Sequence, residues 1–245
     1  MISETLNRSC EEMKKRKSNT PVYYPIMLNI EGKRCVVVGG GNIALRKIRM
    51  LLDCGADVTV VSPKPHLGVA KLSEKKAIHL IHRNYKFGDL MDATIAVAST
   101  DVREINRMVA HEANQLGIPV NVVDDPRLSS FIVPSFFRRE NLTIAVSSAG
   151  TSPALARKIR THLEKSLGKE YATLLSLIGE VRSALRERGC AADGEAWQEV
   201  LDLDALIRLM QKGQRKKAET VLLTKLKAFR GGIESQEDFE KKETF

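Results

Sequence analysis

The sequence predicts an α/β fold in which a doubly wound parallel sheet precedes a small α+β segment and a C-terminal helical domain. Two observations predict the sheet. A glycine-rich turn joins an apolar strand to an amphipathic helix, and further apolar strands then alternate with helical patterns up to residue 126. Such alternation is typical of parallel sheets with helices on both faces. A third observation separates the rest of the chain, because after Gly168 the apolar residues recur only at helical spacing.

The first predicted strand, Cys35 to Val38, runs directly into three glycines. A helix follows, with apolar residues at helical spacing, and it ends at Cys54-Gly55 because glycine past the last turn is a common stop signal. A second strand, Val58 to Val61, ends at Ser62-Pro63. Strand, turn, helix and strand within about thirty residues have the length of one βαβ unit.

The spacing Gly39-x-Gly41-x-x-Ala44 fits the fingerprint of dinucleotide-binding Rossmann-type domains, with alanine in the last position. Gly39 permits a tight turn, and Gly41 lets the backbone approach a pyrophosphate held at the helix N-terminus. We therefore expect the turn and the following strand ends to bind a dinucleotide. The candidate residues are Gly39, Gly40, Gly41, Asn42, Ile43, Ser62, Pro63, Thr100 and Asp101.

One part of the fingerprint is missing. A carboxylate is expected about twenty residues further on, at the end of the second strand, where it holds the ribose hydroxyls. That position is Ser62, while Asp57 comes before the strand and Lys64 nearby suits a 2′-phosphate. The residues alone therefore leave NAD and NADP open.

Three more strands are predicted before residue 126. They are Ala77 to His82, Ala93 to Ala98 and Pro119 to Val123, with helices around Val69 to Lys75 and over Val102 to Leu116. Ligands of such sheets lie outside the carboxyl ends of the strands. These ends carry Thr100-Asp101 and Asp124-Asp125 besides the glycine turn, so they define a candidate site.

The flanking segments give less specific signals. Tyr23 to Leu28 is apolar, and we expect it to pack on the edge of the sheet. Strands are predicted at Phe131 to Val133 and Leu142 to Val146, around a polar turn, and a helix over Ala154 to Leu167. The Ser147-to-Pro153 turn before that helix is either an anion pocket beside basic residues or a capped helix with an exposed basic face.

Composition limits the partners. The chain has 39 basic and 30 acidic residues, a net charge of +9, which favours an anionic ligand. Aromatic residues make up only 5% and are not interleaved with a basic run, so we expect no nucleic acid. We also expect no membrane span and no signal peptide, because no apolar run is long enough.

The potential metal ligands show no pattern. Four cysteines without pair spacing predict neither a zinc site nor a disulfide framework, and they favour the cytoplasm. Five histidines are scattered without ligand spacing, so we expect no fixed metal site.

Seven motifs together resemble the precorrin-2 dehydrogenase/sirohydrochlorin ferrochelatase family, the siroheme-synthase N-terminal type. They are Tyr24-Pro25-Ile26, VVVGGGNIALRKIRMLL, VVSP, ASTD at 98–101, VNVVDDP at 120–126, SFIVPS at 130–135 and LTIAVSSAGTSPALARKIR at 142–160. They occur in order over about residues 22 to 185. The resemblance implies NAD-dependent oxidation of precorrin-2 to sirohydrochlorin, in some members with insertion of ferrous iron to give siroheme. It also implies a homodimer.

The resemblance assigns site residues as well. The family's catalytic aspartate corresponds to Asp124, and a serine that tunes substrate or metal handling corresponds to Ser148, although Ala149 stands where the family commonly has glycine. A carboxylate at the lip of a strand can act as the base of the oxidation. The alternative is that Asp124 and Asp125 only shape the turn before Pro126. The carboxylate-rich tetrapyrrole calls for basic partners, and the candidates are Arg127, Arg138, Arg139, Arg157 and Arg160.

The predicted organisation is a polar arm (1–21), an NAD-binding domain (22–126), a dimerisation and substrate segment (127–165), a helical domain (166–232) and a charged tail (233–245) with too few apolar residues to fold. Two other functions stay open. One is a tetrapyrrole protein that only chelates metal, and the other is a regulatory module that senses NAD.

Overall fold

The computed structural model describes residues 21–190 and 192–240. They fall into two compact units, one formed by residues up to 133 with 148–152 and the other by residues 134–147 with those from 153 onward. Each unit is described by itself.

The first unit contains a five-stranded sheet with the strand order β3-β2-β1-β4-β5. Its strands are β1 (Arg34–Val38), β2 (Asp57–Val61), β3 (His79–Ile81), β4 (Ile95–Ala98) and β5 (Val120–Val122). All neighbouring pairs are parallel, and Val38 lies opposite both Val61 and Ala98. The predicted doubly wound parallel sheet is thereby confirmed.

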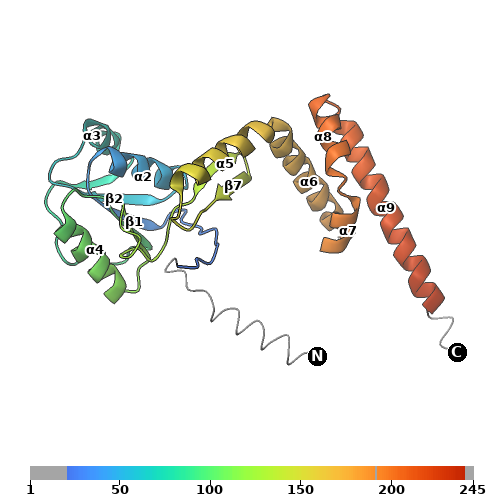
Figure 1. The fold of residues 1–245 in the computed structure, drawn as a ribbon. Coiled ribbons are helices and arrows are strands. Elements are labelled where there is room, and N and C mark those ends of the chain that lie inside the picture. The colour runs from blue at the N-terminus through green and yellow to red at the C-terminus, as the bar shows by residue number, and fades with distance from the viewer. Residues whose placement is uncertain (1–20, 191, 241–245) are drawn as a thin grey trace. The chain divides into compact units, whose positions relative to one another are not determined.

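Helices cover both faces of this sheet (Figure 1). Helices α2 (Asn42–Leu52) and α3 (Leu67–Glu74) lie on one face, and α4 (Arg103–Gln115) lies on the other. Strand residues alternate between the two cores: Val37 packs with Ile48 of α2, whereas Val36 packs with Val109 of α4. This two-sided burial explains why the strands read as continuous apolar runs.

A buried carboxylate fastens the loop before β4. Glu112 of α4 is fully buried, and its side chain accepts hydrogen bonds from the Tyr85 hydroxyl and from the backbone N–H groups of Gly88 (3.0 Å) and Leu90 (3.2 Å). Burial, and then the neighbouring Glu112, raise the pKa of Tyr85 far above its usual value. The network therefore satisfies polar atoms that would otherwise be costly to bury.

The segment that follows β5 differs from its prediction. Phe131 to Val133 is not a strand, because two serine hydroxyls accept from N–H groups of β5 and the backbone bonds on this edge are confined to Val120 O, which accepts from Ser130 N–H (2.9 Å) and Phe131 N–H (3.4 Å), so no ladder continues. The Ser130 hydroxyl accepts from Val120 N–H (2.8 Å), and Ser129 accepts from Val122 N–H (2.9 Å). Phe131 itself packs against the core on the α2 face.

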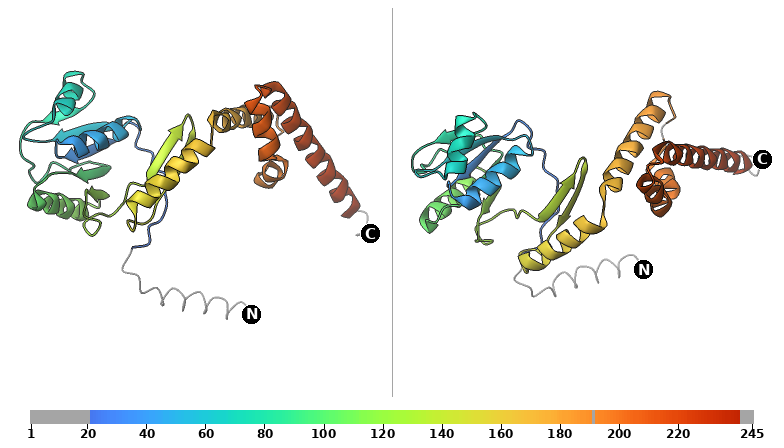
Figure 2. Two further views of the ribbon diagram at one scale, coloured as in Figure 1. Left: turned by 45° about the horizontal axis from the view of Figure 1, so that its top comes forward. Right: turned by 90° about the horizontal axis from the view of Figure 1, so that it is seen from above.

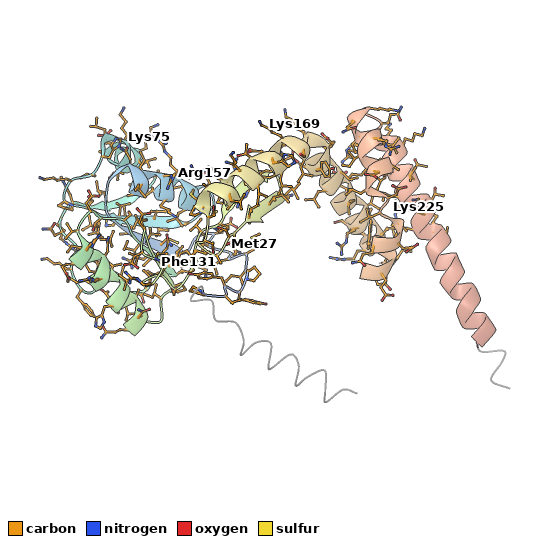
Figure 3. All side chains as sticks on the ribbon, in the orientation of Figure 1. Met27, Lys75, Phe131, Arg157, Lys169 and Lys225 are labelled. Carbon is orange, nitrogen blue, oxygen red and sulfur yellow. The ribbon has the colours of Figure 1, made fainter. Side chains whose placement is uncertain are left out.

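The apolar lead-in was also predicted wrongly. Val22, Tyr24 and Met27 are 76–87% exposed and belong to no strand or helix, so the segment does not cover the sheet edge (Figure 3). Its prolines, Pro21 and Pro25, lack the N–H groups that an added strand would need.

The second unit begins with an antiparallel hairpin, β6 (Ser135–Arg139) and β7 (Leu142–Val146). Helix α5 (Pro153–Ser166) packs along it (Figure 2). The polar turn is only Glu140–Asn141, with Glu140 in the left-handed region (φ 51°). Arg139 joins the two elements, since its guanidinium donates to the carbonyl oxygens of Glu164 (2.6 Å) and Leu167 near the end of α5.

Four helices complete this unit: α6 (Lys169–Glu187), α7 (Gly194–Val200), α8 (Leu203–Gln211) and α9 (Arg215–Glu240). Their core is built around Leu177, Trp197, Leu206 and Leu222. Helix α7 is too short for a periodic pattern and was not predicted. It is started by Asp193, whose carboxylate accepts from Ala196 N–H (2.8 Å).

The end of the chain corrects another expectation. Helix α9 continues to Glu240, so residues 233–240 are helical where a charged, unfolded tail was predicted. A helix that is already nucleated adds residues at little cost, and Glu and Gln are good helix formers. The predicted arm up to residue 20 and the tail from 241 lie outside the described residues. Within the described residues, no helix has the length and apolar content needed to cross a membrane.

Candidate functional site

The predicted site residues of the first unit follow the carboxyl ends of its strands. All five strands are parallel, so these ends lie along one edge of the sheet. The chain leaves β1 toward β2 on one side, and β4 lies on the other side, which makes β1/β4 the switch point where such sheets bind ligands. Gly39 follows β1 and Ser99 follows β4, so the two turns meet at this point.

Gly39 is pressed against the turn after β4. Its φ is +121°, a region that only glycine adopts readily, and a Cβ on it would lie 2.4 Å from the carbonyl oxygen of Ser99. Its own N–H donates to Val61 O (2.9 Å), and Ser99 N–H donates to Val38 O (2.8 Å). No other residue fits at this position without moving the backbone.

Gly40 is pressed against the opposite wall. A Cβ there would lie 2.3 Å from the Ser62 hydroxyl oxygen and 2.9 Å from Pro65 Cα. The Gly40 carbonyl accepts from His66 N–H (2.7 Å), which fastens the loop after β2 to the glycine turn. Ser62 is only 3% exposed, so the structure places it beneath Gly40, whereas Pro63 and Lys64 are exposed.

Gly41 faces open space. A Cβ on this residue would meet no atom within 4 Å. Gly41 is also the N-cap of α2, which has no side-chain cap and no acidic residue in its first turn. The first N–H groups of a helix need a partner, and the next two residues, Asn42 and Ile43, are exposed. This donor set, with a positive helix end, fits a pyrophosphate.

Thr100 follows β4 and is hydrogen-bonded to α4, so its polar groups are less available to a ligand than predicted. Asn106 is 9% exposed, and its side-chain oxygen accepts from Thr100 N–H (3.2 Å) and from the Thr100 hydroxyl (2.8 Å). The Asn106 amide nitrogen donates to Thr100 O (2.9 Å). Asp101, the next residue, is exposed.

Asp124 lies just beyond β5, on the same edge of the sheet. Its side chain is exposed, and its backbone is in the left-handed region (φ 60°). Residues other than glycine adopt this region uncommonly, aspartate more readily than most, and left-handed positions cluster at functional sites. Asp125 is turned to other partners: its carboxylate accepts from Arg127 N–H (3.1 Å) and lies 3.6 Å from the Arg127 guanidinium.

Asp124 interacts electrostatically with a lysine of helix α2. Lys47 of this helix is half-buried. Burial lowers its pKa, Arg46 lowers it further, and Asp124 acts in the opposite direction. A cation on the helix that carries the glycine turn therefore lies within electrostatic reach of the predicted catalytic carboxylate.

Ser148 lies in a tight turn that also belongs to the first unit. Its hydroxyl accepts from Ser152 N–H (3.0 Å), and its carbonyl accepts from Thr151 N–H (2.9 Å). Ala149 (φ 50°) and Gly150 (φ 85°) are both left-handed. The turn therefore adopts a conformation that glycine would favour at position 149.

The candidate arginines differ in their surroundings. Arg127 of the first unit has a 92% exposed side chain. In the second unit, Arg138 and Arg157 are exposed, the latter near the start of α5 (Figure 3). Arg160 is half-buried and paired with Glu164, and its Nε is buried without a hydrogen-bond partner among the described residues.

Two residues of the site were missed in the sequence, His66 and Asn106. Asn106 stands three, four and seven residues before the buried Val109, Ala110 and Ala113. A polar residue in register with the apolar face of a helix was the available signal, because buried amides need partners. His66 offered no signal, since its backbone, not its side chain, contacts the glycine turn.

Comparison with known proteins identifies the relatives. A family described as NAD(P)-binding matches residues 26–135, and the family described as the central part of a sirohaem biosynthesis protein matches residues 139–166. The first match supports the predicted nicotinamide cofactor. A solved structure of SirC, a precorrin-2 dehydrogenase, has the same fold, with a TM-score of 0.62 and 23% identity, over 84% of this chain and 100% of the other.

Among curated proteins, a siroheme synthase of Methylobacillus flagellatus is 43% identical over 164 residues, which are 67% of this chain and 35% of the relative. Siroheme synthase 1 of Aeromonas salmonicida is 39% identical over 199 residues, which are 80% of this chain and 42% of the relative. The chain thus spans less than half the length of these relatives. With two family models matched in order, the chain belongs to the precorrin-2 dehydrogenase/sirohydrochlorin ferrochelatase family, the siroheme-synthase N-terminal type.

Proposed function

We propose that the protein oxidises precorrin-2 to sirohydrochlorin with NAD. The observation that carries this proposal is the position of Asp124, an exposed carboxylate with a left-handed backbone on the sheet edge that also holds the glycine turn. Membership in the family and the confirmed NAD(P)-binding domain support it.

The residues divide the work as follows. The glycine turn and the first turn of α2 bind the pyrophosphate, with Asn42 and Ile43 at the exposed helix start. A bound nicotinamide supplies the hydride acceptor. Asp124 accepts the proton that leaves the substrate, because an exposed carboxylate beside the crevice can serve as a general base.

The substrate is a polycarboxylate, and basic side chains would bind it. We propose Arg127, Arg138, Arg157 and Arg160 for this role, with Ser148 as a further substrate contact. The exposure of the first three supports the proposal, since a solvent-facing guanidinium can meet a carboxylate of the substrate. Arg160 would first have to leave Glu164.

Substitution of the predicted base tests the proposal. Asp124→Asn keeps the size of the side chain, so the protein should fold and bind NAD as the wild type does. Its rate of precorrin-2 oxidation should fall at least 100-fold, which is the smallest usual contribution of a general base. A variant with wild-type turnover would contradict the assignment of Asp124. NAD binding without turnover in the wild type itself would instead favour an NAD-sensing module.

Insertion of ferrous iron into sirohydrochlorin is a second activity of the same site, with Asp124 taking the protons of the pyrrole nitrogens. The exposed, solvent-facing carboxylate supports it. Iron here is a substrate and needs no resident site. Siroheme formation from sirohydrochlorin in the absence of NAD would identify this activity, and chelation without any oxidation of precorrin-2 would make the protein a chelatase only.

We propose a homodimer that works in the cytoplasm, with residues 127–165 serving dimerisation and substrate binding. Leu155 and Ile159 of α5 support this role, since both are large apolar residues and are 54% and 42% exposed. Light scattering over a range of concentrations should give the dimer mass. A mass that stays monomeric throughout would contradict the dimer.

A further inference from the structure

Both polar atoms of the Asn106 side chain form hydrogen bonds with one residue, Thr100, in the turn after β4. It lies in the second turn of α4 and is 9% exposed. Its side-chain oxygen accepts two hydrogen bonds, from the N–H and the hydroxyl of Thr100, and its side-chain nitrogen donates to the Thr100 carbonyl. Three bonds of 2.8–3.2 Å therefore fix Thr100 from three sides.

Thr100 is thereby occupied within the protein. Besides its bonds to Asn106, its hydroxyl oxygen accepts from Val102 N–H (3.2 Å) and lies 3.0 Å from Val102 O. A hydroxyl has a single hydrogen, and the 2.8 Å bond to Asn106 uses it, so no hydrogen is left to donate to a ligand. Thr100 thus shapes the turn.

The turn after β4, which Asn106 holds in place, packs against one side of the glycine turn. The residue before Thr100 is Ser99. Its carbonyl oxygen lies so close to Gly39 that a Cβ added to this glycine would be only 2.4 Å from it. The other wall, Ser62 and Pro65, is equally close to Gly40. The glycine turn is therefore confined on both sides, and a shift of Ser99 would change the position of the turn.

We propose that Asn106 is a positioning residue for the dinucleotide site. By clamping Thr100 it holds the turn after β4 against Gly39 and keeps the crevice between β1 and β4 in its binding geometry before the dinucleotide arrives. The inference rests on the nucleotide-binding part of the proposed function. A site that is already ordered pays less conformational entropy on binding, so the loss of the clamp weakens binding of the dinucleotide specifically.

The test compares Asn106→Ala with Asn114→Ala, a control with the same change on an exposed residue of the same helix. The Kd for NAD is measured by calorimetry, and the KM values for NAD and precorrin-2 are measured in the full chain. Asn106→Ala should raise the Kd and KM for NAD at least tenfold and leave the KM for precorrin-2 within twofold. The control should leave all of them unchanged. A purely structural role would lower the fraction of active protein without changing the Kd.

An unchanged Kd for NAD in folded Asn106→Ala would overturn the inference, as would an equal effect of the control. Thr100→Val, which removes one hydroxyl, keeps the test decisive if Asn106→Ala does not fold. It should weaken NAD binding at least threefold, and an unchanged Kd would refute the clamp. Wild-type protein that binds NAD without oxidising precorrin-2 would refute the proposed reaction alone, because the Kd values still decide the role of Asn106.

Discussion

Substitutions of Gly39 and Gly41 separate packing of the glycine turn from binding of the dinucleotide. Both glycines belong to the fingerprint, yet their surroundings are opposite. An alanine at Gly39 would place its Cβ 2.4 Å from Ser99 O at a φ of +121°, whereas an alanine at Gly41 would meet nothing within 4 Å. We therefore expect Gly39→Ala to impair mainly the fold and Gly41→Ala to impair mainly binding.

The magnitudes follow from these surroundings. At Gly39, backbone strain of about 1–3 kcal/mol adds to overpacking of about 1–3 kcal/mol, so the free energy of unfolding should fall by about 2–6 kcal/mol. In a chain of this size that loss lowers the Tm by roughly 5–20 °C. At Gly41, alanine is a poorer N-cap than glycine by no more than about 1 kcal/mol, so the Tm should fall by only a few degrees.

Binding of NAD should respond in the opposite way, with the direct loss at Gly41. A methyl group at Gly41 enters the space through which the pyrophosphate reaches the backbone, and the Kd for NAD should rise at least tenfold, equivalent to about 1.4 kcal/mol. Calorimetric titration with NAD and thermal melts of both variants measure the two effects. NAD binding by Gly41→Ala within twofold of the wild type would refute the placement of the pyrophosphate at this turn. An unchanged Tm for Gly39→Ala would refute the packing argument.

Three further predictions concern cofactor choice, acid stability and backbone strain. NAD should support faster turnover than NADP, and the preference would be contradicted if NADP were much faster and Lys64→Ala abolished its advantage. The Arg83 guanidinium holds the pKa of Asp89 below its usual value, so the folded carboxylate stabilises the protein at neutral pH and that contribution disappears as the pH falls through its lowered pKa. Asp89→Asn should therefore lower the free energy of unfolding by about 1–3 kcal/mol at pH 7, and urea titrations should show the difference shrinking as acid protonates the wild-type group; a constant difference would contradict the ion pair. Ala149→Gly should raise the Tm by about 1–3 °C, because relief of left-handed strain slightly exceeds the extra freedom of glycine in the unfolded chain, and a lower Tm would contradict this balance.

The fold of the first unit could be predicted because its signals are local. The end of the first strand at Val38-Gly39 and the helical spacing after Gly41 can be recognised from neighbouring residues. Similar strand and helix patterns repeat along the chain, and this repetition predicts the parallel sheet. Strand β7 was predicted with its exact bounds for the same reason. The resemblance to the family singled out Asp124 as the base, whereas the residues alone left it as either a base or a turn former, and its role stays a prediction.

The errors arose where a distant contact decides. Phe131 to Val133 is apolar enough for a strand, but serine hydroxyls already accept from the Val120 and Val122 N–H groups of β5. Asn106 is one of several polar residues of α4, and only the packing of that helix shows that it faces Thr100. The length of α9 depends on a helix that is nucleated earlier in the chain, which local composition does not report.

The central claim is tested most directly by anaerobic incubation of the wild-type protein with precorrin-2 and NAD, with the absorption spectrum followed over time. NADH and sirohydrochlorin should appear together in equal amounts, because each oxidised substrate passes one hydride to the cofactor. Ferrous ion added afterwards should produce a second spectral change if the same site also chelates. Bound NAD without formation of NADH, or sirohydrochlorin formed without NADH, would contradict the proposed dehydrogenase.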